Sequence, residues 1–187
     1  GVQKGGEGGT GMYVRGGDVD QNLVILDEAT VYNIGHLFGF FSVFNQDAIK
    51  DMTLYKGAFP SKYGGRLSSV LDIKMNEGNN NKFHSKGGIG LLSSRLMIEA
   101  HLKKNKGSFM IAGRRTYIYQ VFKWIGSFLP YYFYDLNAKV NHKVSKKDRI
   151  YLSAYTGRDK LGIDFTENTD SDQSNLDFGL GYGNITS

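Results

Sequence analysis

The stretch YDLNAKVNHKV, residues 134–144, decides the fold because apolar and polar side chains alternate along it. Leu136, Ala138, Val140 and Val144 share one parity, and the residues of the other parity are all polar or charged. Successive side chains of a β-strand point to opposite faces of the sheet. The alternation therefore predicts a long strand with one apolar and one polar face.

The same alternation recurs on both sides of this stretch, at residues 94–103, 107–115, 149–156 and 176–182. An earlier apolar run has the opposite parity, because Ile89 and Leu91 are odd-numbered whereas Leu96 and Ile98 are even-numbered. A one-residue change of parity would move every side chain to the other face. We therefore expect a turn at residues 92–95 and about six antiparallel strands in all.

Alternation alone also fits a soluble β-sandwich, whose apolar faces would point inward. Three features favour a membrane barrel. The strands are about ten residues long, as a tilted bilayer crossing requires, whereas ordinary strands have about five or six. Tight lysine-rich turns at 103–107 and 145–148 alternate with long connections at 116–132 and 158–175. Aromatic residues also crowd the strand ends, as at a membrane interface. They are Tyr117, Tyr119, Phe122, Trp124, Tyr131, Tyr132, Phe133 and Tyr134.

Within the first long connection, the apolar residues at 116–129 follow helical spacing, which predicts a short amphipathic helix at the lip. Residues 1–78 have a different pattern, with short strands, glycine corners and a helical turn at 45–50 that Asn45 would cap. The three asparagines 79–81 mark a hinge. We therefore expect an α+β domain at 1–78 and the strands of a barrel at 79–187. Six strands are fewer than the smallest known single-chain barrel has, so the chain is expected to be a piece of a longer protein.

The composition narrows the function. The 187 residues include no cysteine, which rules out thiolate metal sites, disulfides and cysteine nucleophiles. The formal net charge is +5, but the paired lysines fall at turns instead of along one groove, so nucleic acid is not expected. No catalytic constellation stands out, which predicts a protein that is not an enzyme. The histidines lack the spacing of metal ligands, and neither a metal nor a cofactor is expected. They are His36, His84, His101 and His142.

The motifs GMYVRGGDVDQNLVILDEATVYN and KGAFPSKYGGRLSSVLDIKM, in this order, resemble the plug domain of TonB-dependent outer-membrane receptors, closest to the Bacteroidetes-type branch. The strands after residue 79 resemble the beginning of the same family's 22-stranded barrel. The resemblance implies a plug that closes a barrel in the outer membrane of a Gram-negative bacterium. It also implies outer-membrane lipid and an inner-membrane TonB complex as partners, and allows a surface lipoprotein partner.

The resemblance also points to residues that lock plug to barrel. The family's Val-Arg-Gly signature falls on Val14, Arg15 and Gly16, and its arginine pairs with carboxylates of the barrel wall. A second lock arginine corresponds to Lys56, and a lysine lacks the forked geometry of a guanidinium. Glu99 faces the interior by parity and is a candidate partner for Arg15.

The expected function is therefore active uptake of a ligand through a plug-gated barrel, with ligand-binding residues that the sequence does not identify. The alternative is a soluble β-rich binding or adhesion module. The two differ in where the apolar faces of 96–102 and 136–144 point, since a barrel turns them outward and a sandwich buries them.

Overall fold

The computed structural model describes residues 2–4, 12–14, 21–32, 34–36, 41–65, 68–126, 131–164 and 173–186. At residues 2–4, 12–14, 41, 162–164 and 173–186 it describes only the course of the backbone. No helix in this described part of the chain has the length and hydropathy of a membrane-spanning segment.

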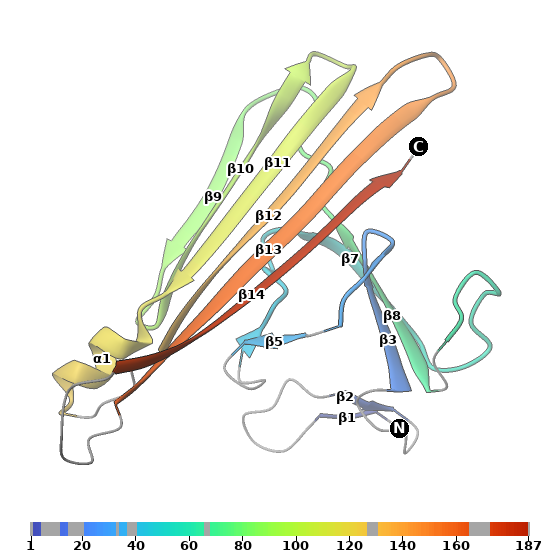
Figure 1. Ribbon diagram of the computed structural model, residues 1–187. Helices are drawn as coiled ribbons and strands as arrows, with labels where there is room; N and C mark the ends of the chain where they lie inside the picture. Colours follow the sequence, from blue (N-terminus) through green and yellow to red (C-terminus); the bar gives the residue numbers. More distant parts are fainter. Residues whose placement is uncertain are drawn as a thin grey trace.

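The N-terminal unit is built on a four-stranded sheet in the order β4-β3-β8-β7, in which β3 and β8 are parallel and the other pairs antiparallel. The continuous apolar run of β3 predicts a strand that is buried on both faces, and its last three residues are buried. Two small hairpins, β1–β2 and β5–β6, flank this sheet (Figure 1). The strands are β1 (Val2–Lys4), β2 (Met12–Val14), β3 (Asn22–Leu26), β4 (Ala29–Thr30), β5 (Gly35–His36), β6 (Phe41–Ser42), β7 (Ile49–Tyr55) and β8 (Ser69–Met75).

The helix predicted at residues 45–50 is wrong, because residues 46–48 form a turn and β7 already begins at Ile49. The predicted capping group is nevertheless used, since the Asn45 side-chain oxygen accepts a hydrogen bond from the Asp47 backbone N–H at 3.1 Å. An asparagine can stabilise a turn in this way as well as a helix start. Pairing of Ile49 with Met75 then continues the chain as a strand.

The second part of the chain is one six-stranded antiparallel sheet, called the wall below, in the order β14-β13-β12-β11-β10-β9. Its strands are long and inclined, and the N-terminal unit lies against one of its faces (Figure 1). The short helix α1 (Ile118–Trp124) lies at one end of the wall, and the tight turns β10–β11 and β12–β13 lie at the other. The strands are β9 (His84–Ile89), β10 (Ser93–Lys103), β11 (Gly107–Thr116), β12 (Tyr131–Lys143), β13 (Arg149–Asp164) and β14 (Gln173–Thr186).

Two boundaries of the wall differ from the prediction. The turn expected at 92–95 lies at residues 90–92, because β10 already begins at Ser93. The connection expected at 158–175 is shorter, since β13 continues to Asp164 and pairs with β12 as far as Leu161. Charged residues on both faces of β13 beyond Thr156 had hidden this part of the strand from a search for apolar alternation.

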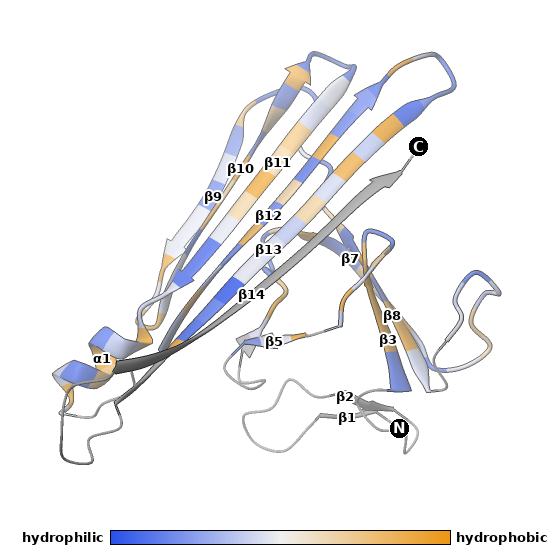
Figure 2. Ribbon diagram, viewed as in Figure 1, coloured by the Kyte–Doolittle hydropathy of each residue, from blue (hydrophilic) through white to orange (hydrophobic). Residues whose placement is uncertain are grey.

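The two faces of the wall have opposite chemistry. Odd-numbered residues of β12, from Tyr131 to Asn141, are buried and face the N-terminal unit, although most of them are polar. Residues of the other parity point away, so that Leu136 is 44% exposed and Leu152 on β13 is 48% exposed. Figure 2 shows the resulting alternation of hydrophilic and hydrophobic residues along the strands.

The apolar core lies between the N-terminal unit and the inward face of the wall. Val43 and Ile73 of the unit belong to the same buried cluster as Met97, Met110 and Tyr155 of the wall. Both parts therefore contribute to one core on the inward side of the wall. The apolar residues on the outward side, such as Leu96, Leu136 and Leu152, stay about half exposed. The outward direction of this face is the arrangement expected for a barrel wall and the opposite of a sandwich.

Candidate functional site: the contacts between the N-terminal unit and the wall

Three polar contacts join the N-terminal unit to the inward face of the wall. We name them the histidine cluster, the Asp27 contact and the Asp47 contact after the residue that the unit contributes. Each brings together side chains that are distant in sequence, and each includes a group that is almost completely buried. Buried ionic groups need well-placed partners to offset the loss of hydration.

The histidine cluster is centred on His36 of β5, which is 1% exposed. Its Nδ1 lies 2.8 Å from Asp159 Oδ2, and its Nε2 lies 3.6 Å from Asp135 Oδ2. The imidazole stacks on Phe133, with 4.0 Å between the ring centroids and an interplanar angle of 10°. The Tyr155 hydroxyl lies 3.4 Å from Nε2. The wall therefore encloses the ring on several sides and places a carboxylate near each nitrogen.

Arg114 completes this cluster. Its Nε donates to Asp135 Oδ2 at 2.8 Å, and a terminal nitrogen donates to the backbone carbonyl of Ser42 at 2.7 Å. The guanidinium also lies over the Phe133 ring, 5.0 Å from its centroid. Arg114 thus binds the wall's own carboxylate and the backbone of β6 at the same time, which makes it a direct link between the two parts.

Protonation of His36 balances the charges of the cluster. Burial lowers the pKa of this imidazole, but the hydrogen bonds and charges of Asp135 and Asp159 outweigh burial, so the pKa is raised above its usual 6.5. The imidazolium can donate from both nitrogens, whereas the neutral ring has one donor only. With His36 and Arg114 charged, two cations face two carboxylates.

The Asp27 contact is a buried ion pair. Lys139 Nζ lies 2.9 Å from Asp27 Oδ1 and 3.3 Å from the backbone carbonyl of Met75, and the lysine is 7% exposed. Asp27 Oδ1 also accepts the Met75 backbone N–H at 3.1 Å. Asp27 has a φ of 45°, a left-handed conformation that aspartate and asparagine tolerate better than most residues. The lysine of the wall therefore reaches the β3–β4 turn and the end of β8 together.

The Asp47 contact has one buried anion and two cations. Asp47 Oδ1 lies 2.7 Å from Lys86 Nζ, and Asp47 Oδ2 lies 2.7 Å from Arg95 Nε. The Asp47 side chain is 3% exposed, whereas both cationic side chains are about half exposed. β9 and β10 supply the cations, which the alternating pattern places on the inward face. The N-terminal unit therefore contributes the anion here, as it does in the Asp27 contact.

The connection between the two parts is also held in place. The backbone carbonyl of Glu77 accepts hydrogen bonds from Ser108 Oγ and from Asn141 Nδ2, both at 2.7 Å. The Glu77 carboxylate lies 3.0 Å from Lys50 Nζ. The segment that leaves β8 is thereby bound to β11 and β12 before β9 begins.

The predicted lock residues take different places. Arg15 lies outside the described residues. Lys56 is exposed, and no ion pair within the described part of the chain involves it. Glu99 does face inward, and its Oε1 lies 3.2 Å from Nδ1 of His84 on the neighbouring strand. The structure therefore brings none of the three together among the residues that it describes.

The contacts that are formed were missed by the sequence analysis. The inward parity of Asp135 and Lys139 followed from the alternation, but their partners in β3–β5 could not be inferred from the sequence. The sequence analysis assigned no partner to His36, and the structure places it between the carboxylates of Asp135 and Asp159. A buried histidine between short strands gave no signal of distant partners. Within the described part of the chain, no group of three or more histidine, aspartate or glutamate residues could hold a metal ion.

Comparisons with known proteins agree with this arrangement. Residues 1–69 match the family model of the TonB-dependent receptor plug domain. The crystal structure of the siderophore receptor PirA from Acinetobacter baumannii is similar, with a TM-score of 0.57 and 16% sequence identity. The similarity covers 79% of this chain and 25% of that chain, and at this identity it concerns the fold alone. No curated protein matches the sequence. Residues 1–69 therefore carry the sequence of a TonB-dependent receptor plug domain, and most of the chain shares its fold with part of a siderophore receptor.

Proposed function

We propose that the chain forms the gate and part of the wall of an outer-membrane transporter. The N-terminal unit acts as the plug, and the wall is the first part of a larger barrel, 22-stranded as in the family that the sequence resembles. The plug blocks the barrel until a TonB complex of the inner membrane pulls on it, after which a bound ligand can pass. The protein carries out no chemistry on its ligand in this proposal.

One observation supports this proposal above the others: the wall has its polar face buried and its apolar face exposed. Asn137 is 2% exposed against the N-terminal unit, whereas the neighbouring Leu136 is 44% exposed on the other side. A soluble binding or adhesion module, the alternative, would leave this apolar face in water. An outer-membrane location provides the lipid that such a face requires.

The three contacts suit a gate. Ionic contacts are specific in orientation, and those with half-exposed partners, such as Arg95, can be separated at lower cost than an apolar core. The lock role of Arg15, Lys56 and Glu99 remains part of the proposal. So do the Bacteroidetes-type affiliation, the domain boundary near residue 78 and a surface lipoprotein partner. The ligand is left open, since the siderophore of one receptor with a similar fold does not carry over to this chain at 16% identity.

Site-directed thiol labelling tests the proposal, because the chain has no cysteine of its own. Leu136→Cys and His101→Cys are placed in the receptor, which is then exposed in isolated envelopes to a membrane-impermeant thiol reagent. Both positions are exposed in the structure, but Leu136 points outward and His101 points inward. We expect protection at 136 and labelling at 101 in the outer-membrane fraction. A soluble protein that is labelled at both positions would contradict the proposal and favour the binding module.

A further inference from the structure

Three cationic side chains lie close together on the inward face of β9, β10 and β11. Arg95 and Arg114 are register neighbours, and Lys86 lies two residues farther along the same face, opposite Met97. Cβ atoms of register neighbours are about 5 Å apart, and like charges at this distance repel each other. Arg114 is neutralised within the wall, because it contacts Asp135 Oδ2 at 2.8 Å and 2.6 Å. Lys86 and Arg95, called the cation pair below, need an anion from elsewhere.

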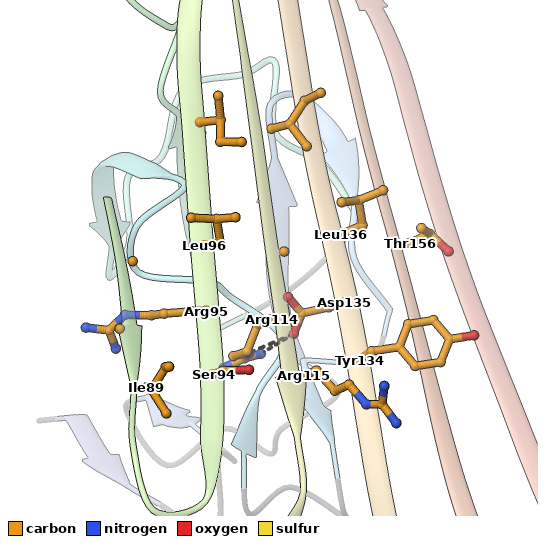
Figure 3. Close-up of a pocket in the computed structure, with 15 residues that line it drawn as sticks. Ile89, Ser94, Arg95, Leu96, Arg114, Arg115, Tyr134, Asp135, Leu136 and Thr156 are labelled. Atoms are coloured by element: carbon orange, nitrogen blue, oxygen red, sulfur yellow. Dashed lines mark hydrogen bonds and ion pairs between the residues drawn. The ribbon is translucent and has the colours of Figure 1, made fainter. Parts of the chain in front are cut away.

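Asp47 of the N-terminal unit supplies this anion. Its two oxygens contact Lys86 Nζ and Arg95 Nε, each at 2.7 Å. The carboxylate is buried, whereas both cationic side chains are about half exposed, so that water reaches the cations. Figure 3 shows Arg95 directed away from Arg114 and Asp135, which are joined to each other. The wall therefore presents a place for an oxyanion, and a side chain of the unit occupies it while the two parts are in contact.

We propose that the cation pair binds an oxyanion of the transported ligand, a carboxylate or phosphate group, when Asp47 moves away with the unit. The proposal rests on the proposed function, because only a gate separates from the wall. Separation leaves Lys86 and Arg95 without a counter-ion, next to the charge of Arg114. A ligand anion that takes the place of Asp47 binds the separated state only and therefore stabilises it, whereas a neutral ligand does not. The ligand thus belongs to the anionic class.

The charges also predict which anions bind best. Two cations share the single negative charge of Asp47, which leaves an excess of one positive charge. A phosphate monoester carries about −1.5 to −2 charges at neutral pH and would neutralise both cations. The guanidinium of Arg95 can in addition bind two of its oxygens in a forked geometry. We therefore expect a dianion to bind more tightly than a carboxylate monoanion.

A further cation follows in the direction of the tight turns. Lys139 lies in the next row of the inward face, two strands and about 10 Å away from Arg95. Its anion, Asp27, also belongs to the unit. Movement of the unit would therefore free this lysine together with the cation pair. An anion that leaves the cation pair would then meet Lys139 on its way toward the β10–β11 and β12–β13 turns.

The anion site is tested by removing the charge of Asp47 and adding inorganic phosphate as the probe. Asp47→Asn keeps the size of the side chain and the backbone N–H that bonds to Asn45. Isothermal titration calorimetry on the whole receptor in detergent, at constant ionic strength, measures phosphate binding. We expect the dissociation constant to be at least about tenfold lower in Asp47→Asn than in the wild type, and lower for phosphate than for acetate. Asp51→Asn, at an exposed position of β7, is the matched control and should bind phosphate as the wild type does.

The same site can be tested with Asp47 in place. Phosphate competes with Asp47 for the cation pair, so hydrogen exchange at residues 45–55 should become faster as phosphate replaces chloride at constant ionic strength. In Lys86→Gln/Arg95→Gln, phosphate should have no such effect. Adding Arg95→Gln to Asp47→Asn should likewise abolish most of the gain in phosphate affinity. Unchanged affinity in this double variant, or equal affinity in Asp47→Asn and the wild type, would overturn the proposal.

The failure of this inference can be distinguished from the failure of the proposed function. Protection at Leu136→Cys and labelling at His101→Cys, without phosphate binding by Asp47→Asn, would overturn the anion site and leave the transporter proposal intact. Labelling at both positions of a soluble protein would overturn the proposed function. The assignment of the anion to a transported ligand would then be wrong as well, even if Asp47→Asn binds phosphate.

Discussion

His36 of the N-terminal unit and Asp159 of the wall lie 2.8 Å apart, Nδ1 to Oδ2, although 123 residues separate them in sequence. This contact depends on the proton of the imidazole, because Asp135 lies on the other side of the ring. Its strength should therefore vary with pH, and in the proposed transporter it would tie the gate to the wall most firmly when His36 is charged.

The first prediction concerns this pH dependence. The folded-state pKa of His36 is raised above 6.5, so its contribution to stability is fully present below about pH 6.5 and is lost as the pH rises through the raised value. We expect amide hydrogen exchange in β5 and β6, corrected for intrinsic rates, to become faster across this window. His36→Gln should remove the pH dependence and cost about 1.5–3 kcal/mol at low pH, the range for hydrogen bonds to charged groups.

The matched control is His101→Gln, which replaces an exposed histidine of the wall. This variant should keep the wild-type pH profile in β5 and β6. If His36→Gln keeps that profile as well, another group is responsible for it.

The second prediction concerns the two cations of the Asp47 contact. Lys86 and Arg95 each lie 2.7 Å from a different oxygen of Asp47, so either cation can neutralise the carboxylate when the other is removed. Lys86→Gln and Arg95→Gln should each cost less than about 1 kcal/mol, as expected for half-exposed partners. The double variant leaves a buried carboxylate without a cation and should cost more than the sum by about 1–2 kcal/mol.

This non-additivity is measured as the free energy of local opening, from hydrogen exchange at residues 45–55 in the four members of a double-mutant cycle. Additive effects would show that the two cations act independently of Asp47. Lys143→Gln and Lys147→Gln, two exposed lysines near the β12–β13 turn, provide a control cycle in which no excess cost is expected.

The third prediction concerns the ion pair between Lys139 and Asp27. It distinguishes the cost of losing this contact from the cost of leaving the Asp27 carboxylate buried without a cation. Lys139→Met should cost about 3–5 kcal/mol, because it leaves the buried carboxylate of Asp27 without its ion-pair partner. Adding Asp27→Asn should restore much of this loss. Asparagine tolerates the left-handed conformation at position 27, and its side-chain oxygen can still accept the Met75 N–H.

Urea-induced unfolding in detergent measures this rescue in the wild type, Lys139→Met, Asp27→Asn and the double variant. The midpoint and slope of each unfolding curve are fitted together. A double variant that is less stable than Lys139→Met alone would contradict the argument. Lys74→Met, at an exposed position next to Met75 on β8, is the matched control and should change the midpoint little.

The sequence was sufficient to predict the wall because alternation is a local property of each strand. The parity of residues 134–144 placed Leu136 outward and Asp135 and Lys139 inward, and the structure has this arrangement. The start of β12 at Tyr131 and the extension of β13 beyond Thr156 were missed, because charged and aromatic residues near a strand end interrupt the apolar signal without ending the backbone pairing.

The contacts between the two parts could not be predicted, for a different reason. An ion pair between Asp27 and Lys139 depends on how a turn of one sheet meets the face of another, and no periodicity encodes that placement. The resemblance to a family suggested a cation on the N-terminal unit and carboxylates on the wall. The described contacts at Asp27 and Asp47 have the opposite polarity, because the lysines and arginines of β9, β10 and β12 point inward and meet carboxylates.

The last prediction concerns the connection between the two parts. Gly78 has a φ of +83°, and a Cβ at this position would lie 2.3 Å from the backbone carbonyl oxygen of Phe109. Alanine would therefore be strained in its backbone and would collide with β11, which cannot move away without breaking its own pairing. The left-handed conformation alone costs about 1–2 kcal/mol for a residue with a Cβ, and the collision adds to this. Gly78→Ala should accordingly release the Glu77 carbonyl from Ser108 and Asn141.

Hydrogen exchange at residues 76–83 measures this release directly, and we expect it to be at least about tenfold faster in Gly78→Ala than in the wild type. Gly64→Ala is the matched control, because a Cβ at Gly64 would meet nothing within 4 Å. Its exchange in the same segment should be unchanged. Equal protection in Gly78→Ala and the wild type would mean that the connection can take another path past Phe109, and that its attachment to β11 and β12 does not depend on this glycine.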